Sequence, residues 1–334
     1  MDIQNNKNVT EEEWTTIITF KFAFFTLTNT ACLIFLVING IIIYTLCSGP
    51  VFVETPRYMF LLNLVVADSI VLLISQLLYV LSVFVILSYP LCGVFVMISI
   101  MSAHISPFTL TVMSIERYIA VCFPFHHPTI VTIRNSIFAI LSVWGMICID
   151  IFLHIAFLLE FPFHLLPSLQ MNYFCISTAL LIGPRSKVYE MGSTITVFLF
   201  SGLVITLSFI GVMIIALSAS TDKASADKAR NTLLLHMFQL SLNLMSTMAL
   251  PVFTDVATLT DPIMAGRLFV VVYIFLVMMP RCLSALTYGL KDPCLRPILV
   301  SRLCCRLQIS TNTVTAKTHD GQKKTKLHPV PEFT

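Results

Sequence analysis

Seven long apolar runs dominate this sequence, and few folds can accommodate them. Each is long enough to cross the roughly 30 Å hydrocarbon core of a bilayer, which takes about 20 helical residues. The runs must form helices, because lipid offers the backbone no hydrogen-bond partners and the runs are too long for barrel strands. The predicted spans are Phe22–Cys47, Tyr58–Leu87, Leu91–Ile115, Ser136–Phe161, Gly192–Ser220, Thr232–Thr254 and Leu268–Leu290.

The composition agrees with a membrane protein and leaves no room for a second, soluble domain. Hydrophobic residues make up 57% of the chain and charged residues 11%, against about 25% charged residues in soluble domains. We predict an all-α membrane protein, a seven-transmembrane helix bundle with a short amphipathic helix after the seventh span. The predicted parts are an extracellular N-terminus (1–21), the bundle (22–290), the juxtamembrane helix (291–307) and a disordered cytoplasmic tail (308–334).

The positions of Lys and Arg predict the orientation of the bundle. Basic residues concentrate at the ends that are cytoplasmic if the N-terminus is outside, as the positive-inside rule requires. The glycosylation sequon at Asn8 falls on the same external side. The acidic stretch Met1–Trp14 lacks the basic start of a cleavable signal, so the first span stays as an anchor. The net charge of +3 is too small to indicate a nucleic-acid partner.

Ionisable residues within the spans are the main functional clues. Each costs about 2.5 to 3.5 kcal/mol to insert, so each needs a partner or a purpose. They are Asp68, His104, Asp150, His154 and Arg281, with Glu116 and Arg117 at the inner edge of the third span.

Several motifs resemble those of rhodopsin-like (class A) G-protein-coupled receptors. They are the run Leu61–Asp68 in the second span, the run Met113–Cys122 closing the third, Trp144 in the fourth, and Cys92 placed 25 residues before Arg117. Other stretches are similar to vertebrate odorant receptors, most closely those of fish and amphibians. They are Thr55–Phe60, the short third cytoplasmic loop Thr221–Arg230, and Leu286–Pro293.

The resemblance implies roles for a motif at the cytoplasmic edge of the third span. Glu116, Arg117 and Tyr118 are expected to form the G-protein switch, in which Arg117 pairs with Glu116 in the silent state and is freed on activation. The alternative is an interfacial Arg117 that extends toward lipid phosphate.

Two cysteines predicted to lie outside the cell are candidates for a disulfide. Cys92 opens the third span and Cys175 lies in the external loop from Pro162 to Met191. Thiols in an oxidising compartment tend to pair, and a bridge here would hold the loop over the bundle. Two unrelated free cysteines are the alternative.

A polar site is expected around Asp68, where the family holds a sodium ion. This chain departs from the family, because Ser284-Ala285 replaces the usual Asn-Pro and Arg281 lies about one turn earlier. We expect Arg281 to pair with Asp68, since two buried opposite charges cost less together than apart. An Arg281 facing a water-filled cavity is the alternative. The expected site comprises Asn39, Asp68, Ser106, Arg281, Ser284 and Tyr288.

The family position of the ligand pocket is the outer half of the bundle. No acid stands at Ser99, where amine receptors carry one, and the seventh span has no lysine for a retinal Schiff base. His104 is the titratable member, either packed and satisfied or binding a metal beside His154. The candidate lining residues are Ser99, Ile100, Ala103, His104, Phe253, Val256, Ile274 and Met278.

The tail carries a candidate amphipathic helix on the inner leaflet. Apolar and basic residues alternate over Leu290–Leu307; Pro293 suits a helix start, but Pro297 argues against the helix. Cys304 and Cys305 are either palmitoylation sites or reduced thiols.

The resemblance to odorant receptors implies that this chain is an odorant receptor in the plasma membrane. It would bind a small, mostly apolar molecule and activate a heterotrimeric G protein of the stimulatory, olfactory type. The alternatives are a receptor for a metabolite or peptide and, from another class, a seven-helix transporter or channel using Asp68, Asp150 and Arg281. No catalytic constellation, metal set or cofactor motif is present in the sequence, so we expect no enzyme and no cofactor.

Overall fold

The computed structural model of the chain describes residues 2–84, 87–163, 168–170, 175, 177–218, 271–291 and 295–301, and shorter stretches between 234 and 268. Within these residues the regular structure is helical, apart from an isolated bridge between Ser88 and Gln170. The elements are α1 (Asp2–Ser48), α2 (Pro50–Val53), α3 (Pro56–Phe84), α4 (Tyr89–Cys122), α5 (His127–Ile130), α6 (Ile133–Leu159), α7 (Ser177–Leu180), α8 (Pro184–Ser218), η2 (Tyr273–Met278) and α11 (Met279–Lys291).

The five long helices of the described part are apolar enough to cross a bilayer. Their candidate spans are Phe22–Ser48, Pro56–Leu81, Tyr89–Cys122, Ile133–Leu159 and Pro184–Ala216. The first four begin within three residues of the predicted starts. For the sixth and seventh predicted spans, residues 241–249, 251–253 and 271–291 are helical.

Two predicted boundaries were wrong. The third span was expected to end at Ile115, but α4 continues to Cys122 and carries Glu116, Arg117 and Tyr118 on its last turns. The fifth span was expected to begin at Gly192, but α8 begins at Pro184. Proline suits a first helical turn because its missing N–H has no intrahelical partner there. The external loop is correspondingly shorter than predicted.

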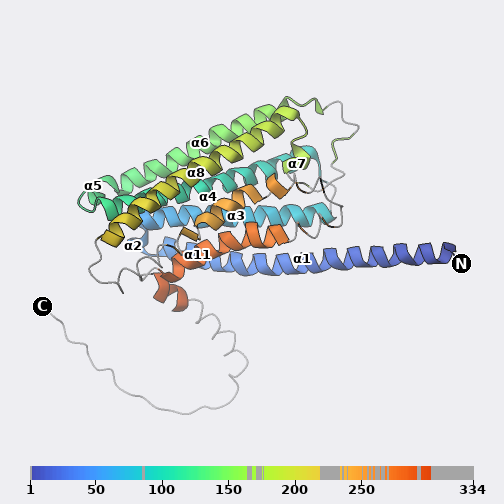
Figure 1. Ribbon diagram of the computed structural model, residues 1–334, viewed down its shortest axis with the longest axis horizontal. Helices are drawn as coiled ribbons and strands as arrows, with labels where there is room; N and C mark the ends of the chain where they lie inside the picture. Colours follow the sequence, from blue (N-terminus) through green and yellow to red (C-terminus); the bar gives the residue numbers. More distant parts are fainter. Residues whose placement is uncertain are drawn as a thin grey trace, which may run out of the picture.

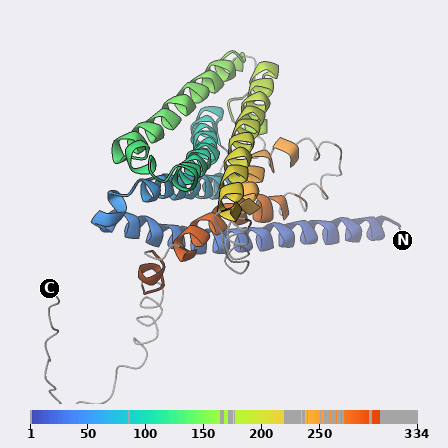
Figure 2. The same ribbon diagram turned by 60° about the vertical axis from the view of Figure 1, so that its left-hand side comes forward.

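Helix α4 lies at the centre of the described bundle. It packs against α3, α6 and α8, while α1 packs against α3 and α11. Figures 1 and 2 show α6 and α8 on one side of α4 and α1 on the other. The space-filling view shows the yellow and yellow-green side chains of α8 as a continuous ridge on one face. Leu199, Leu203 and Ile214 on α8 are each more than 60% exposed, as expected of a helix that faces lipid.

The seventh helix contains a π segment just before a proline. In η2 the backbone hydrogen-bonding register widens, and the N–H of Met279 reaches the carbonyl of Ile274. Pro280 follows and cannot donate a backbone hydrogen bond, which makes an irregular register less costly at this point. Arg281 comes directly after Pro280, so the irregular segment adjoins the residue that carries the buried charge.

A short helix follows the seventh one and is docked on the bundle. Residues 295–301 are helical, and Leu295 and Leu299 are buried in one cluster with Ile42. Pro297 does not prevent this helix, since it lies within the helical residues 295–301. Residues 302–334, which include Cys304 and Cys305, lie outside the described residues.

Candidate functional site

Asp68 and Arg281 form a buried ion pair in the middle of the bundle. Arg281 Nη1 donates to Asp68 Oδ1 at 2.8 Å, and the two side chains are 2% and 1% exposed. Ser106 on α4 donates to the same oxygen at 2.6 Å. Arg281 Nη1 also lies 3.4 Å from Ser106 Oγ. This geometry is the pairing expected from the similar depth of the two charges, and it joins α3, α4 and α11.

The ion pair does not fit a sodium ion beside Asp68. A guanidinium nitrogen already occupies hydrogen-bonding distance of the carboxylate, and a second cation there would be repelled by it. Asn39, expected in this site, instead donates from Nδ2 to Ser69 Oγ at 3.0 Å. Ser284 and Tyr288 lie on α11, but their side chains are outside the described residues. The chain thus supplies its own fixed cation at this position.

A second polar contact joins α3, α4 and α6, between the ion pair and the Glu116 end of α4. Trp144 Nε1 on α6 donates to Asn63 Oδ1 on α3 at 3.0 Å. Asn63 Nδ2 donates to Thr109 Oγ1 on α4 at 2.8 Å. Asn63 and Trp144 both belong to the motifs named above, but sequence reasoning did not bring them together. The contact ties α3, α4 and α6 with neutral hydrogen bonds, which inside a bilayer are each worth about 1 kcal/mol or less.

Asp150 on α6 is the centre of a polar cluster between α4, α6 and α8. Its Oδ2 lies 3.0 Å from His104 Nδ1 on α4. Its Oδ1 accepts from Tyr189 at 2.8 Å and from Ser193 at 2.8 Å, both on α8. Three residues on two neighbouring helices therefore share the carboxylate of Asp150 on α6.

His154 completes this cluster and bears on the metal alternative. Its Nδ1 donates to the Asp150 carbonyl at 3.0 Å, its side chain is 1% exposed, and its ring centroid lies 4.7 Å from that of Tyr189. The described residues contain no group of three or more His, Cys, Asp or Glu placed to hold a metal ion. The geometry favours a His104 that is packed in the bundle and hydrogen-bonded to Asp150 over one that binds a metal ion.

A disulfide joins Cys92 at the start of α4 to Cys175, with their Cα atoms 5.8 Å apart. Both residues are buried, in a cluster with Leu180 and Leu181, which lie just before α8. The bridge forms the pairing predicted for the external cysteines. It fixes the chain after α6 to the start of α4.

The opposite end of α4 carries Glu116, Arg117 and Tyr118. Glu116 Oε1 lies 3.5 Å from His127 Nε2 on the short helix α5, a contact that the sequence did not indicate. All three residues of the motif are half-buried, and Tyr118 makes an edge-to-face contact with Phe123 at 5.9 Å between ring centroids. The acid of the motif is thus held next to the loop that follows α4.

Comparison with known proteins assigns the family. The family described as "7 transmembrane receptor (rhodopsin family)" matches residues 38–286, more than half of the chain. The chain belongs to the rhodopsin family of seven-transmembrane receptors. This confirms the resemblance found in the sequence motifs and excludes the transporter or channel alternative. Receptors of this family couple to G proteins and are not enzymes.

Individual relatives include odorant receptors. The receptor is 31% identical to "Odorant receptor 131-2" of Danio rerio over 271 residues, which cover 78% of this chain and 79% of that protein. It is 28% identical to "Olfactory receptor 1J1" of Homo sapiens over 151 residues, 43% and 46% of the two chains. A shorter match of 119 residues, 31% identical, relates 34% of the receptor to 25% of the "Alpha-1A adrenergic receptor" of Mus musculus.

The eight candidate pocket residues of the receptor differ in burial. Ser99, Ile100 and Ala103 are half-buried on α4, whereas His104 is engaged with Asp150. Met278 is 1% exposed and packs in a cluster with Phe24, Leu72 and Tyr273. The other three are Phe253 and Ile274, both half-buried, and Val256, which is exposed. That they line one ligand pocket stays a prediction.

A glycine of the receptor makes room for the switch motif. A Cβ added at Gly211 on α8 would lie 2.9 Å from Tyr118 Cδ2 and nearer still to Cε2, while one at Gly192 on the same helix would meet nothing within 4 Å. We expect Gly211→Ala to displace the Tyr118 ring and to lower the thermal stability of purified receptor. Gly192→Ala should be neutral, or stabilising by up to about 1 kcal/mol through helix propensity. Equal melting temperatures for the two variants would contradict the contact.

Proposed function

We propose that this receptor detects a small, mostly apolar odorant and activates the stimulatory, olfactory type of G protein. The supporting observation is its identity of 31% to an odorant receptor over most of both chains. The sequence similarity extends to the human "Olfactory receptor 1J1", although over less than half of the chain. Shared ancestry at this level supports a common stimulus class and not a particular odorant.

The two ends of α4 support an orientation with the N-terminus outside. A disulfide forms in an oxidising compartment, so the Cys92 end faces outside. The Glu116–Tyr118 end then faces the cytoplasm, where a G protein is available. The N-terminal end of the first span lies on the same side as Cys92, because the chain crosses the membrane twice, through α1 and α3, before it reaches Cys92 near the start of α4. The external N-terminus carries Asn8 as a proposed glycosylation site.

The proposed ligand site lies near the outer half of α4. Ser99, Ile100 and Ala103 offer small and apolar surface there, and the carboxylate of Asp150, which contacts His104, already accepts hydrogen bonds from His104, Tyr189 and Ser193. A ligand that needs a free carboxylate therefore has less to gain here than an apolar one. Phe253 and Ile274 would supply the facing side.

The proposed switch is the release of the cytoplasmic end of α4. Glu116 is held near His127, and Arg117 adjoins it on the same helix. Ligand binding would favour an arrangement in which Arg117 is available to the G protein. For this the ligand needs only to bind that arrangement more tightly than the silent one. A change of tenfold in signalling corresponds to about 1.4 kcal/mol of such difference.

Cyclic AMP in cells that express the receptor with the olfactory G protein tests the proposal. The cells are exposed to a panel of water-borne and volatile odorants, and surface expression is measured by antibody labelling. We expect at least one compound to raise cyclic AMP in the wild type and not in Arg117→Ala. Silence across the panel at proven surface expression would contradict the odorant function, and a response that survives Arg117→Ala would contradict the switch.

A further inference from the structure

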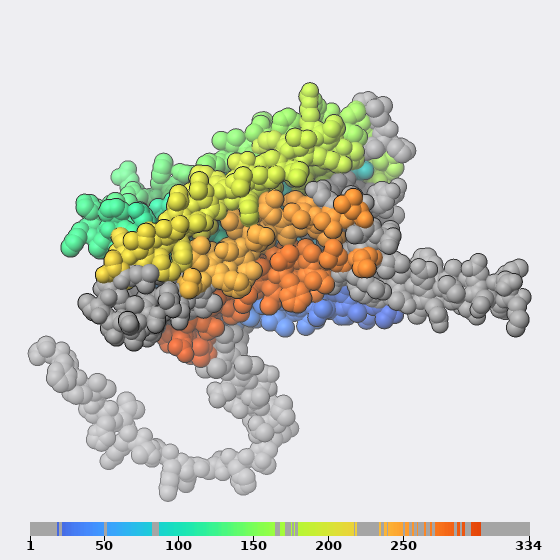
Figure 3. Space-filling view, viewed as in Figure 1, coloured from blue at the N-terminus to red at the C-terminus, as the bar shows by residue number. Residues whose placement is uncertain are grey.

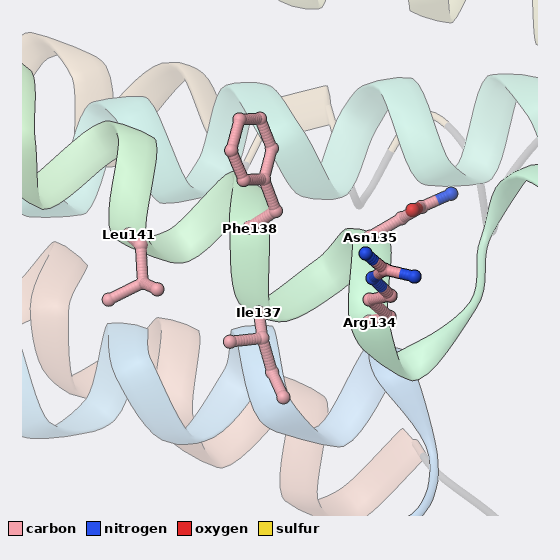
Figure 4. Close-up of a pocket in the computed structure, with 5 residues that line it drawn as sticks. All are labelled: Arg134, Asn135, Ile137, Phe138 and Leu141. Atoms are coloured by element: carbon pink, nitrogen blue, oxygen red, sulfur yellow. The ribbon is translucent and has the colours of Figure 1, made fainter.

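A pocket of about 470 Å³ lies on the outward side of α6, near the start of the helix. It is lined by Arg134, Asn135, Ile137, Phe138 and Leu141. Figure 4 shows the two polar side chains at one end of this segment and Leu141 at the other. The pocket thus has a polar end and an apolar end along one helix.

The polar end offers a cation that no described residue neutralises. Arg134 and Asn135 are both exposed. Asn135 is held in place, since its Nδ2 donates to the carbonyl of Ile130 at 2.7 Å. Within the described part of the chain, no side chain forms an ion pair or a hydrogen bond with the guanidinium of Arg134. A guanidinium presents paired donors that match the oxygens of a phosphate.

The apolar end suits an acyl chain. Phe138 is 72% exposed and Leu141 63% exposed, although both lie on a helix that belongs to the membrane. From Arg134 to Leu141 the helix rises about 10 Å, which is less than the roughly 15 Å of one hydrocarbon leaflet. A lipid whose headgroup lies at Arg134 therefore has an acyl chain at the depth of Phe138 and Leu141.

The position of the disulfide indicates which leaflet of the bilayer surrounds Arg134. Cys92 and Cys175 mark the outer ends of the bundle, and α6 starts next to the opposite end of α4, after Cys122 and α5. Arg134 therefore lies at the cytoplasmic leaflet. Anionic phospholipids give that leaflet its negative surface potential, which complements the charge of Arg134.

We propose that this pocket binds one anionic phospholipid of the cytoplasmic leaflet, with the phosphate on Arg134 and an acyl chain over Phe138 and Leu141. The site shares no residue with the proposed ligand pocket or with the Glu116–Tyr118 switch, and it does not depend on which odorant or G protein the receptor uses. The fraction of receptors with a lipid bound at this face of α6 would then depend on how much anionic phospholipid the inner leaflet contains.

Native mass spectrometry of receptor released from nanodiscs tests the charge requirement. The nanodiscs contain equal amounts of phosphatidylserine and phosphatidylcholine. We expect the wild type to retain about fivefold more phosphatidylserine than phosphatidylcholine. This ratio corresponds to the attraction of about 1 kcal/mol between one basic residue and an anionic membrane surface. Arg134→Gln should remove this preference. The control is Arg296→Gln, which removes an exposed charge from the helix at residues 295–301. Equal losses in the two variants would mean general surface attraction and would overturn the site.

A matched pair of phenylalanines tests the acyl-chain contact. Phe138 and Phe152 lie on the same helix and are 72% and 70% exposed, but only Phe138 lines the pocket. We expect Phe138→Ala to lower the number of retained phosphatidylserine molecules by about one per receptor and Phe152→Ala to leave it unchanged. The same count for both variants, or no lipid preference in the wild type, would overturn the proposal.

Discussion

Reversing either charge of the buried pair, by Asp68→Arg or by Arg281→Asp, is expected to remove most of the receptor from the cell surface. Each single variant places two like charges at hydrogen-bonding distance in a site whose wild-type side chains are 1% and 2% exposed. Breaking a buried ion pair costs about 3 to 5 kcal/mol, a large share of the 5 to 15 kcal/mol that typically stabilises a folded domain. Surface labelling by flow cytometry measures the loss.

The double variant separates pairing from a general need for either residue. Asp68→Arg combined with Arg281→Asp restores opposite charges, and we expect surface expression to recover well above both single variants. A second control, Asp68→Asn with Arg281→Gln, keeps hydrogen-bonding groups without charge and should also exceed Asp68→Asn alone, which leaves Arg281 without its carboxylate. No recovery in either double variant would show that the two side chains do not depend on each other.

Loss of the disulfide is expected to have the second-largest effect. Cys92 and Cys175 are 83 residues apart in sequence, and closing a loop of that length removes chain entropy worth about 4 to 5 kcal/mol in the unfolded state. Cys175→Ser should therefore lower the melting temperature of purified receptor and reduce its surface expression. Cys92→Ser should do the same, and the double variant should be no worse than either single one.

A free cysteine provides the control for the disulfide variants. Cys148 on α6 is exposed and unpaired by disulfide, so Cys148→Ser should leave melting temperature and expression near those of the wild type. Treatment with a reducing agent should lower the melting temperature of the wild type and of Cys148→Ser, and leave Cys175→Ser unchanged. A Cys175→Ser variant as stable as the wild type would refute a stabilising role for the bridge.

The features that depend on length and depth were predictable from the sequence. Hydropathy located the starts of the first four spans to within three residues, because lipid imposes a minimum apolar length on a spanning helix. The pairing of Asp68 with Arg281 followed from two opposite charges at similar depth. The disulfide followed from two cysteines on the oxidising side of the membrane.

The polar cluster around Asp150 depends on helix rotation and could not be predicted in this way. Which faces of α4, α6 and α8 meet is decided by side-chain packing, about which a single hydropathy profile says nothing. A wrong boundary added to the problem, since placing the fifth span from Gly192 onward left Tyr189 in the external loop. The charged residues between Arg185 and Glu190 caused that error, although they form the first turns of α8.

Local backbone features were also beyond the sequence reasoning. The π segment Tyr273–Met278 has the same apolar composition as an α-helix, so only the hydrogen-bonding register distinguishes it. Pro297 argues against a helix after the seventh span because proline lacks a backbone donor, yet residues 295–301 are helical. The contact between Glu116 and His127 joins a helix to a loop whose path no periodicity predicts.

The rate of nucleotide exchange on a purified stimulatory G protein tests the central claim that this receptor signals through the cytoplasmic end of α4. The receptor is placed in nanodiscs with the most active compound of the odorant panel, and binding of a non-hydrolysable GTP analogue is followed over time. The account predicts exchange at least about tenfold faster with the wild type than with Arg117→Ala, a difference of about 1.4 kcal/mol in barrier height. Equal rates for the two proteins, both folded and both at the same density in the nanodiscs, would contradict it.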